Sequence, residues 1–181
     1  MHKQVVCLRH LLVVGRCFYI SLFLLSAMPC VAPLLVAAQS PAQPPAKTVP
    51  SFRFTTHDHH IFANAELPKG QLLLFVFFDP DCEHCRHALR TMDQRPGAYQ
   101  HAEVYLVSMA AWDKIDRFAA TYAPHLMAQQ HVLLLQDESS QYIVKFSPIR
   151  YPSLYLYSTD QSLLDYEDNE NSLFRIEHYT H

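Results

Sequence analysis

The sequence contains little cysteine, and most of it lies near the N-terminus. Three of the five cysteines precede residue 31, so Cys82 and Cys85 are the only two in the rest of the chain. A small exported domain built on a disulfide scaffold, such as a growth factor, uses more cysteines than this. A bridge between residues only three positions apart also closes too small a loop to stabilise a fold much through chain entropy. The pair is therefore expected to take part in a chemical reaction and not to stabilise the fold.

Positive charge is also scarce, and the chain has no basic patch. Three of the 14 Lys and Arg residues (Lys3, Arg9 and Arg16) lie in the N-terminal segment, which leaves 11 basic against 17 acidic residues and a net charge of −6. Nucleic-acid binding depends on cations that neutralise phosphates, so this charge disfavours nucleic acid as a partner. The sequence shows no internal repeat.

Acidic residues are absent before Asp58, and the basic start is followed by a mostly apolar run over residues 18–38. This pattern is typical of a signal peptide, and Val36-Ala37-Ala38 supplies the small residues that a signal peptidase reads. Residues 1–38 are therefore predicted to be a signal peptide or, because the run is close to the roughly 20 residues of a membrane helix, a membrane anchor. The positive-inside bias places everything after the run outside the cytoplasm, in the periplasm or another extracytoplasmic compartment.

Cleavage of this leader is the favoured interpretation, since Pro29 and Pro33 interrupt the apolar run. Lipidation of Cys30 is a weaker alternative. Residues 39–50 contain four prolines and no apolar periodicity, which predicts an extended Pro-rich linker. The remaining residues, 51–181, are expected to form one domain with its own core.

The strongest local pattern is a strand that gives way to a helix. Residues 72–78 form an unbroken apolar run, which predicts a strand buried on both faces. Apolar residues then recur at positions i, i+3, i+4 and i+7, a spacing that places them on one face of a helix. They are Cys85, Ala88, Leu89 and Met92. Asp81 is the predicted N-cap of this helix.

The rest of the domain repeats this alternation. Strands are expected at 52–55, 61–63, 104–107, 132–135, 154–157 and 163–164, with helices near 113–123 and 140–146. In the strand 154–157, alternating Leu and Tyr predict a half-buried strand with tyrosines on the sheet surface, and residues 165–170 are interpreted as a solvated acidic loop. This order predicts an α/β fold, a mixed central sheet flanked by helices.

A Cys-x-x-Cys where a strand gives way to a helix suits reversible disulfide chemistry. The attacking species is a thiolate, so the site must stabilise negative charge on one sulfur. Cys82 is predicted at the first helical position, where unpaired backbone N–H groups and the positive end of the helix dipole converge. Cys85 is expected one turn on, facing the core. Cys82 is then the catalytic nucleophile and Cys85 the resolving thiol.

Charged neighbours are predicted to tune this chemistry. A protonated His84 would favour the Cys82 thiolate, whereas Asp79, Asp81 and Glu83 would oppose it by like-charge repulsion. These residues leave the direction of electron flow open. No cofactor is expected.

A structural disulfide and a metal site are the alternative uses of these cysteines and histidines. A structural disulfide is less consistent with the position at a helix start. A metal site has too few ligands, because no second Cys-x-x-Cys is present, although His84 and His87 lie nearby. The cluster His57-Asp58-His59-His60 is read as a polar turn, with a transition-metal site as the alternative.

Three segments resemble the thioredoxin superfamily, specifically exported TlpA-like (ResA-like) thiol–disulfide oxidoreductases. They are the strand running into Asp81-Cys82-Glu83-His84-Cys85, the stretch from residue 132 to 146, and Ile149-Arg150-Tyr151-Pro152-Ser153 with the strand after it. The resemblance implies a thioredoxin-like three-layer fold, a cis Tyr151–Pro152 bond beside Cys82, and Tyr151 backbone groups that bind a substrate chain. It also implies protein thiol or disulfide substrates and a redox partner, with reduction the favoured direction.

The sequence departs from that family in its acids and its tryptophan. Asp81 stands where tryptophan precedes the first cysteine, Val76 replaces the buried acid of the strand, and Ala88 replaces the acid of the helix. An oxidant or isomerase is the alternative direction, because a histidine before the second cysteine resembles the oxidising Cys-Pro-His-Cys type. The Pro-x-x-x-Thr-x-x-Cys signature of peroxiredoxins is absent around Cys82. A non-enzymatic binding module, or a metal chaperone that uses the two thiols, is the alternative from another class.

Overall fold

The computed structural model describes residues 43–181, which it places in one compact unit. The predicted leader, residues 1–38, lies outside the described residues, as does the beginning of the predicted linker. Within residues 43–181, no helix is long and apolar enough to cross a membrane.

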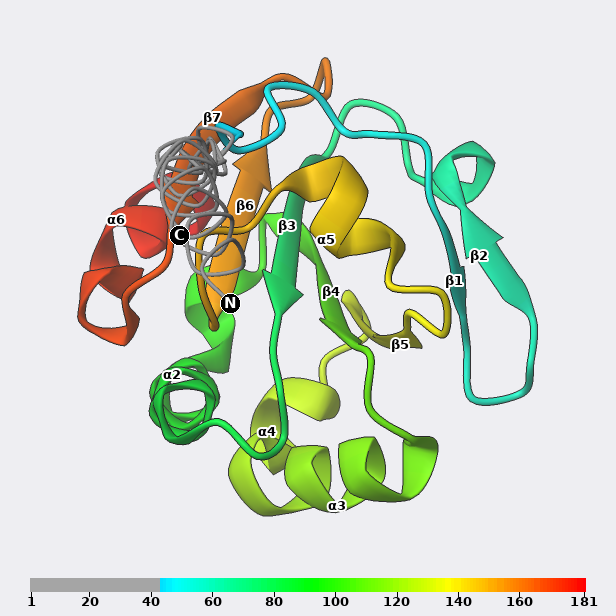
Figure 1. Cartoon of the computed structure of the whole chain (residues 1–181). Coiled ribbons are helices and arrows are strands. Elements are labelled where there is room, and N and C mark those ends of the chain that lie inside the picture. The colour runs from blue at the N-terminus through cyan, green and yellow to red at the C-terminus, as the bar shows by residue number, and fades with distance from the viewer. Residues whose placement is uncertain (1–42) are drawn as a thin grey trace, which may run out of the picture. The chain divides into compact units, whose positions relative to one another are not determined.

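A mixed seven-stranded sheet forms the centre, in the order β2-β1-β5-β4-β3-β6-β7 (Figure 1). Strands β3, β4 and β5 run parallel, whereas β6 and β7 at one edge, and β1 and β2 at the other, pair antiparallel. The strands are β1 (Arg53–Thr55), β2 (Ile61–Ala63), β3 (Leu72–Phe77), β4 (Ala102–Ser108), β5 (Val132–Gln136), β6 (Ser153–Tyr157) and β7 (Leu163–Glu167). The predicted mixed sheet flanked by helices is confirmed.

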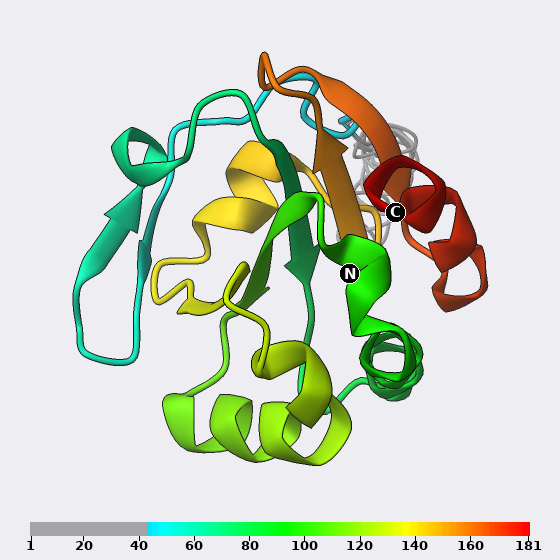
Figure 2. The ribbon, with the colours of Figure 1, turned by 180° about the vertical axis from the view of Figure 1, so that it is seen from behind.

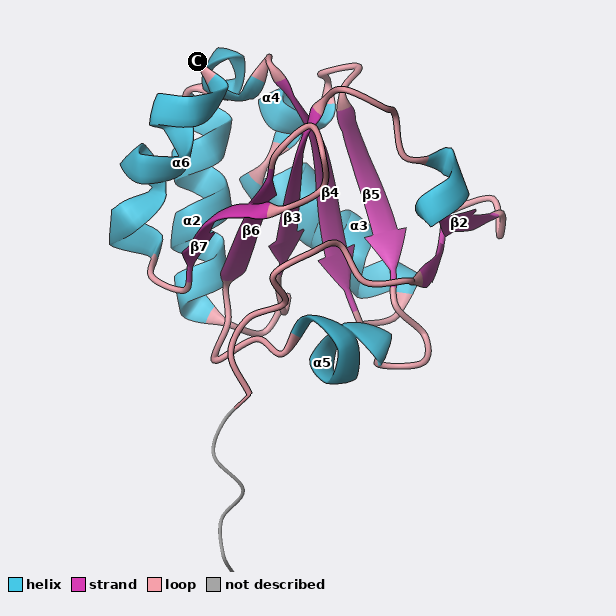
Figure 3. Ribbon diagram, turned by 90° about the horizontal axis from the view of Figure 1, so that it is seen from above, coloured by secondary structure: helices cyan, strands magenta, loops and turns pink. Residues whose placement is uncertain are grey.

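Helices cover both faces of this sheet and complete the three layers (Figures 2 and 3). The helices are α2 (Glu83–Gln94), α3 (Trp112–Tyr122), α4 (Pro124–Met127), α5 (Gln141–Phe146) and α6 (Leu173–Thr180). Buried residues of α2, α3, α4 and α6 share one core cluster, whereas those of α5 belong to another. Of these five helices, α5 therefore lies alone on its face of the sheet, which it covers together with the segment that precedes β1.

Alternation along β3 produces these two cores. Leu74, Val76 and Phe78 point to the face of α2, and the residues between them point to the face of α5. All of these side chains are essentially inaccessible to solvent. Burial of both faces explains why the strand is apolar without interruption.

The core beneath α5 is aromatic. The rings of Phe77 and Tyr142 stack with centroids 3.9 Å apart. Tyr155 and Tyr157 of β6 are fully buried there, and the Tyr155 hydroxyl donates a hydrogen bond of 2.9 Å to the Phe146 carbonyl. The prediction of a half-buried strand with surface tyrosines is therefore wrong, because α5 covers the face that alternation assigned to solvent.

The packed domain begins before Ser51. Ala46 N–H donates to the Phe146 carbonyl at 3.0 Å, Val49 N–H to Gln161 at 3.1 Å, and the Tyr157 hydroxyl donates to the Ala46 carbonyl at 3.2 Å. The second half of the segment that the sequence predicts as linker is thus held against the domain.

Acidic residues on β7 are also buried rather than solvated. Asp165 and Glu167 are both less than a tenth exposed, and both pair with Arg175 of α6, at 2.8 and 2.5 Å. For these two residues the prediction of a solvated loop is wrong, because one guanidinium from the C-terminal helix pairs with both carboxylates.

Candidate active site

The two cysteines lie where β3, near the centre of the sheet, gives way to α2. Two short hydrogen bonds fold the connecting turn: Cys82 N–H donates to the Asp79 carbonyl at 3.0 Å, and Asp81 N–H donates to the Asp79 carboxylate at 2.8 Å. The buried strand therefore delivers the start of α2 to the carboxyl edge of the parallel strands, where ligands bind in open α/β sheets.

Cys82 is itself the N-cap of α2. Its backbone is extended (φ −86°, ψ 125°), and its sulfur accepts a hydrogen bond of 3.4 Å from the Cys85 N–H. The prediction of Asp81 as N-cap, with Cys82 as the first helical residue, is wrong by one position. The Asp81 carboxylate instead turns to Lys114 of α3, at 2.7 Å. The shift places the sulfur beside the Cys85 N–H, one of the N–H groups of the first turn that have no partner within the helix.

Cys85 lies one turn further and is fully buried, with Ala88, Leu89 and Met92 on the same face of α2. Its sulfur accepts only a long hydrogen bond of 3.5 Å, from the Asp79 N–H. Burial raises the pKa of the Cys85 thiol far above its ordinary value, which that hydrogen bond only partly offsets. Cys82 by contrast is partly exposed, so the two thiols differ as predicted.

The predicted tuning residues are mostly paired with other side chains. His84 Nδ1 lies 2.8 Å from Glu170 Oε1, Asp81 pairs with Lys114, and Glu83 lies 3.9 Å from His87. Burial alone would raise the pKa of Glu170, but the hydrogen bond with His84, a backbone hydrogen bond and the charges of the nearby histidines together outweigh it, and the pKa is lowered. Asp79 makes no ion pair with another described residue.

Sequence reasoning missed Glu170 and Lys114. Glu170 belongs to a 3-10 turn (Glu170–Ser172) that packs against α2, and it was assigned to the solvated loop. No local signal marks it. Lys114 lies at the start of the helix that follows β4, the neighbour of β3 in the sheet. That place at the carboxyl edge of an adjacent parallel strand is a signal that could have identified it.

The Tyr151–Pro152 peptide bond is cis, as the resemblance implies. Pro152 is buried, and the half-buried Tyr151 ring lies 5.9 Å from Tyr142 in an edge-to-face arrangement. Burial raises the pKa of the Tyr151 hydroxyl. The predicted role of Tyr151 and Pro152 in substrate binding stays a prediction.

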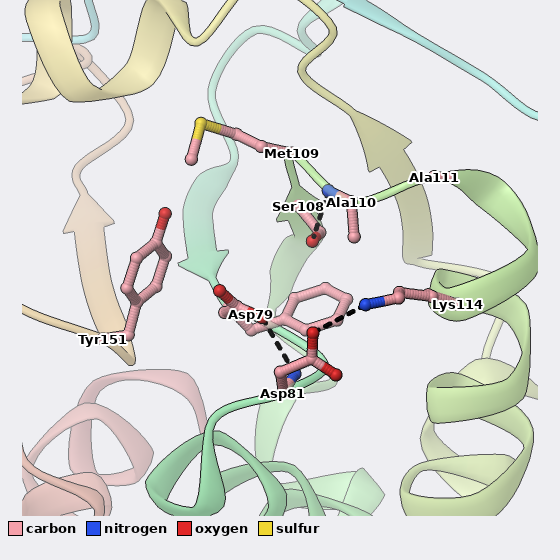
Figure 4. A pocket seen from close by; sticks show the side chains of 9 residues that line it. Asp79, Asp81, Ser108, Met109, Ala110, Ala111, Lys114 and Tyr151 are labelled. Atoms are coloured by element: carbon pink, nitrogen blue, oxygen red, sulfur yellow. Dashed lines mark hydrogen bonds and ion pairs between the residues drawn. The ribbon is translucent and has the colours of Figure 1, made fainter.

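A cavity of about 300 Å³ opens beside the turn that carries Cys82 (Figure 4). It is lined by Phe78, Asp79, Asp81, Ser108, Met109, Ala110, Ala111, Lys114 and Tyr151. Tyr151 stands on one side and the Asp81–Lys114 pair on the other, with Asp79 between them and Met109 opposite. The cavity therefore lies between the carboxyl ends of β3 and β4 and the segment that contains the cis proline.

Among residues 43–181, no group of three or more His, Cys, Asp or Glu side chains is arranged to hold a metal ion. Two of the three histidines of the predicted turn, His57 and His60, have separate partners. His57 lies 3.0 Å from Asp116 and packs on Trp112, with ring centroids 5.0 Å apart, and His60 lies 2.6 Å from Glu66. The side chains of His57 and His60 therefore do not converge on one site.

Comparison with known proteins shows the fold but no close relative. No family model matches the chain, and no curated protein matches its sequence. The thioredoxin domain of a thiol–disulfide oxidoreductase from Bacteroides vulgatus superposes with a TM-score of 0.60 at 14% identity, over 77% of this chain and 99% of that one.

Two further structures are similar to about the same degree. A secreted Mycobacterium tuberculosis disulfide oxidoreductase homologous to E. coli DsbE gives a TM-score of 0.56 at 18% identity, over 71% of this chain and 95% of that one. A peroxiredoxin-like protein from Aquifex aeolicus gives 0.59 at 11% identity, over 78% and 90%. These neighbours share a fold across different chemistries, so the active site must decide between them. On the fold, the predicted class is confirmed: the described part of the chain adopts the thioredoxin fold.

Proposed function

We propose that this chain is a thiol–disulfide oxidoreductase that acts on protein disulfides outside the cytoplasm. The observation that carries the proposal is the asymmetry of the two thiols. Cys82 is partly exposed and receives an N–H from the first turn of α2, whereas Cys85 is fully buried one turn away. An exposed nucleophile with a protected second thiol is what a two-step exchange requires.

The reaction consumes one substrate disulfide. The Cys82 thiolate attacks one substrate sulfur, forms a mixed disulfide and releases the other sulfur as a thiolate. Cys85 then loses its proton to water, and its thiolate attacks the Cys82 sulfur. The first substrate sulfur leaves as a thiolate, and Cys82 and Cys85 are joined. Two electrons pass to the substrate, and a dithiol redox partner restores the reduced pair.

Burial of Cys85 orders these two steps. Because its pKa is raised, Cys85 remains a neutral thiol while Cys82 meets the substrate. In the mixed disulfide the Cys82 sulfur becomes an electrophile one turn from Cys85, and the Cys85 thiolate attacks it as it forms.

The direction and the compartment rest on the sequence. Reduction is the favoured direction because of the TlpA-like resemblance, and the export pattern of residues 1–38 supports an extracytoplasmic site. One structural neighbour is described as secreted. Equilibration with a glutathione buffer measures the potential: about −270 mV, as in thioredoxin, supports reduction, and about −120 mV, as in DsbA, supports oxidation.

Insulin reduction with dithiothreitol as electron source tests the activity. Wild type is expected to accelerate precipitation of the insulin B chain, and Cys82→Ser to lose that acceleration while its circular dichroism stays native. Equal acceleration by both proteins would overturn the proposal. Copper or zinc bound stoichiometrically by the reduced protein, without turnover, would favour the chaperone instead.

A further inference from the structure

We infer that the cavity beside Cys82 binds a basic side chain of the substrate polypeptide, arginine in preference to lysine, next to the cysteine under attack. This inference rests on the proposed function and adds the substrate class to it. Asp79 is the specificity-determining residue. The position, size, charge and walls of the cavity all favour such a ligand.

The cavity lies where a bound substrate chain must pass. Asp79 and Asp81 belong to the turn immediately before Cys82, and Tyr151 precedes the cis proline on the other side. A residue in an extended chain advances by only about 3.3 Å. The side chain next to the substrate cysteine is therefore within reach of the cavity while that cysteine is bonded to Cys82.

The size of the cavity fits one side chain. Sites that enclose cofactors or drug-sized ligands measure about 300 to 1,000 Å³, and this cavity lies at the lower end of that range. Its walls are largely apolar, from Phe78, Met109 and the ring of Tyr151. Such walls suit the methylene stem of a long side chain whose charged end reaches a carboxylate.

The charge of the cavity selects a cation. Asp79 and Asp81 oppose a single ammonium, that of Lys114, so the lining carries one net negative charge. Lys114 is already occupied by Asp81 at 2.7 Å. Asp79 uses one carboxylate oxygen to accept the Asp81 N–H, and its other oxygen makes no hydrogen bond with another described residue. That oxygen is the acceptor offered to a ligand.

Arginine fits this arrangement better than lysine. A planar guanidinium can stack against the Tyr151 ring while its N–H groups reach the carboxylate, and it is less strongly hydrated than an ammonium. An acidic substrate side chain would meet Asp79 and Asp81 with like charge. A neutral one would fill the cavity without using the free oxygen.

Competition between model peptides tests the inference. Three disulfide-linked fluorogenic peptides differ only in the residue next to one cysteine, which is Arg, Gln or Glu. For wild type at low ionic strength, kcat/KM is expected to be about five- to tenfold higher with Arg than with Gln, and lower still with Glu. Added salt should reduce the Arg preference, because the cavity opens to solvent.

Variants identify the residue responsible. Asp79→Asn is expected to bring the Arg-to-Gln ratio below about twofold; a ratio is used because changes common to all peptides cancel. Glu138→Gln is the matched control, since Glu138 is exposed beyond the end of β5 and does not line the cavity. It removes the same charge and should keep the wild-type ratio.

The outcomes separate the two proposals. If wild type turns over no peptide, the proposed function falls, and this inference with it. If wild type turns over all three peptides at equal rates, prefers Glu, or keeps its preference in Asp79→Asn, the function stands and the inference is overturned. The inference would also be overturned if Glu138→Gln lowered the Arg-to-Gln ratio as much as Asp79→Asn does. The preference would then come from the overall negative charge of the domain and not from Asp79.

Discussion

The sulfur of Cys82 accepts a hydrogen bond from the backbone N–H of Cys85, over 3.4 Å, so one cysteine of the pair caps the helix that carries the other. The N–H groups of a first helical turn lack partners within the helix. Here one of them points at the atom that performs the proposed attack. The same turn places Cys85 in the core, so a single helix start produces both the accessible and the protected thiol.

Alkylation should separate the two thiols. We expect iodoacetamide at pH 7 to modify Cys82 at least about ten times faster than Cys85, because the thiolate reacts and burial raises the pKa of Cys85. Because the pKa of Cys85 is raised, Cys85 should still be a neutral thiol at pH 9, so the two alkylation rates should remain different at that pH. Peptide mapping by mass spectrometry measures both sites. Equal rates at either pH would contradict the asymmetry on which the proposed function depends.

Removal of the resolving thiol should trap the intermediate. In Cys85→Ser, the mixed disulfide between Cys82 and a peptide substrate is expected to accumulate, because no second sulfur can displace it. A non-reducing gel followed by mass spectrometry detects it, with Cys7, Cys17 and Cys30 changed to serine in every sample. Cys82→Ser is the control and should form no adduct. An adduct on Cys82→Ser, or none on Cys85→Ser, would reverse or remove the assigned roles.

The sequence predicted the centre of the fold well because the signals there are local. The apolar run of β3 and the spacing of Cys85, Ala88, Leu89 and Met92 each require one type of element, and both are found. The position of the two cysteines at that junction follows directly. The N-cap was misplaced by one residue because Asp81 has a partner, Lys114, from another helix.

The errors concern side chains whose surroundings come from distant segments. Tyr155 and Tyr157 alternate with leucines in the way a half-solvated strand does, and only the packing of α5 and of Ala46 buries them. Asp165 and Glu167 likewise resemble a solvated run until Arg175 is placed beside them. A strand's alternation shows which residues share a face, but it does not show what covers that face.

A largely buried carboxylate near the end of α2, that of Asp93, should make stability depend on pH. Asp93 accepts a hydrogen bond of 2.8 Å from the Leu126 N–H, and His125 Nδ1 lies 2.8 Å from its other oxygen. Burial alone would raise the pKa of Asp93, but these contacts outweigh it and the pKa is lowered. The carboxylate therefore contributes stability above its unfolded pKa, near about 4, and loses it as pH falls through the lower folded value.

We accordingly expect Asp93→Asn to lower the free energy of unfolding by about 1–2 kcal/mol at pH 7 and by less at pH 3. Urea denaturation at the two pH values measures this difference. Asp116→Asn is a control, because Asp116 is nearly half exposed and pairs with a His57 that is more exposed still. A loss that is equal at both pH values would show that the charge of Asp93 is not what holds α2 to α4.

The hydroxyl of Tyr155 provides a test of the aromatic core beneath α5. It donates to the Phe146 carbonyl at 2.9 Å, at the last residue of α5, with both groups buried. Tyr155→Phe keeps the ring and removes one of the two donors to this carbonyl, leaving the Ala46 N–H at 3.0 Å. The loss should cost about 1 kcal/mol in urea denaturation. Tyr179→Phe, at an exposed position of α6, should change stability by less than about 0.5 kcal/mol. If the two variants were equally stable, the hydroxyl would not be fixing α5 on the sheet, and packing of the rings alone would hold this layer in place.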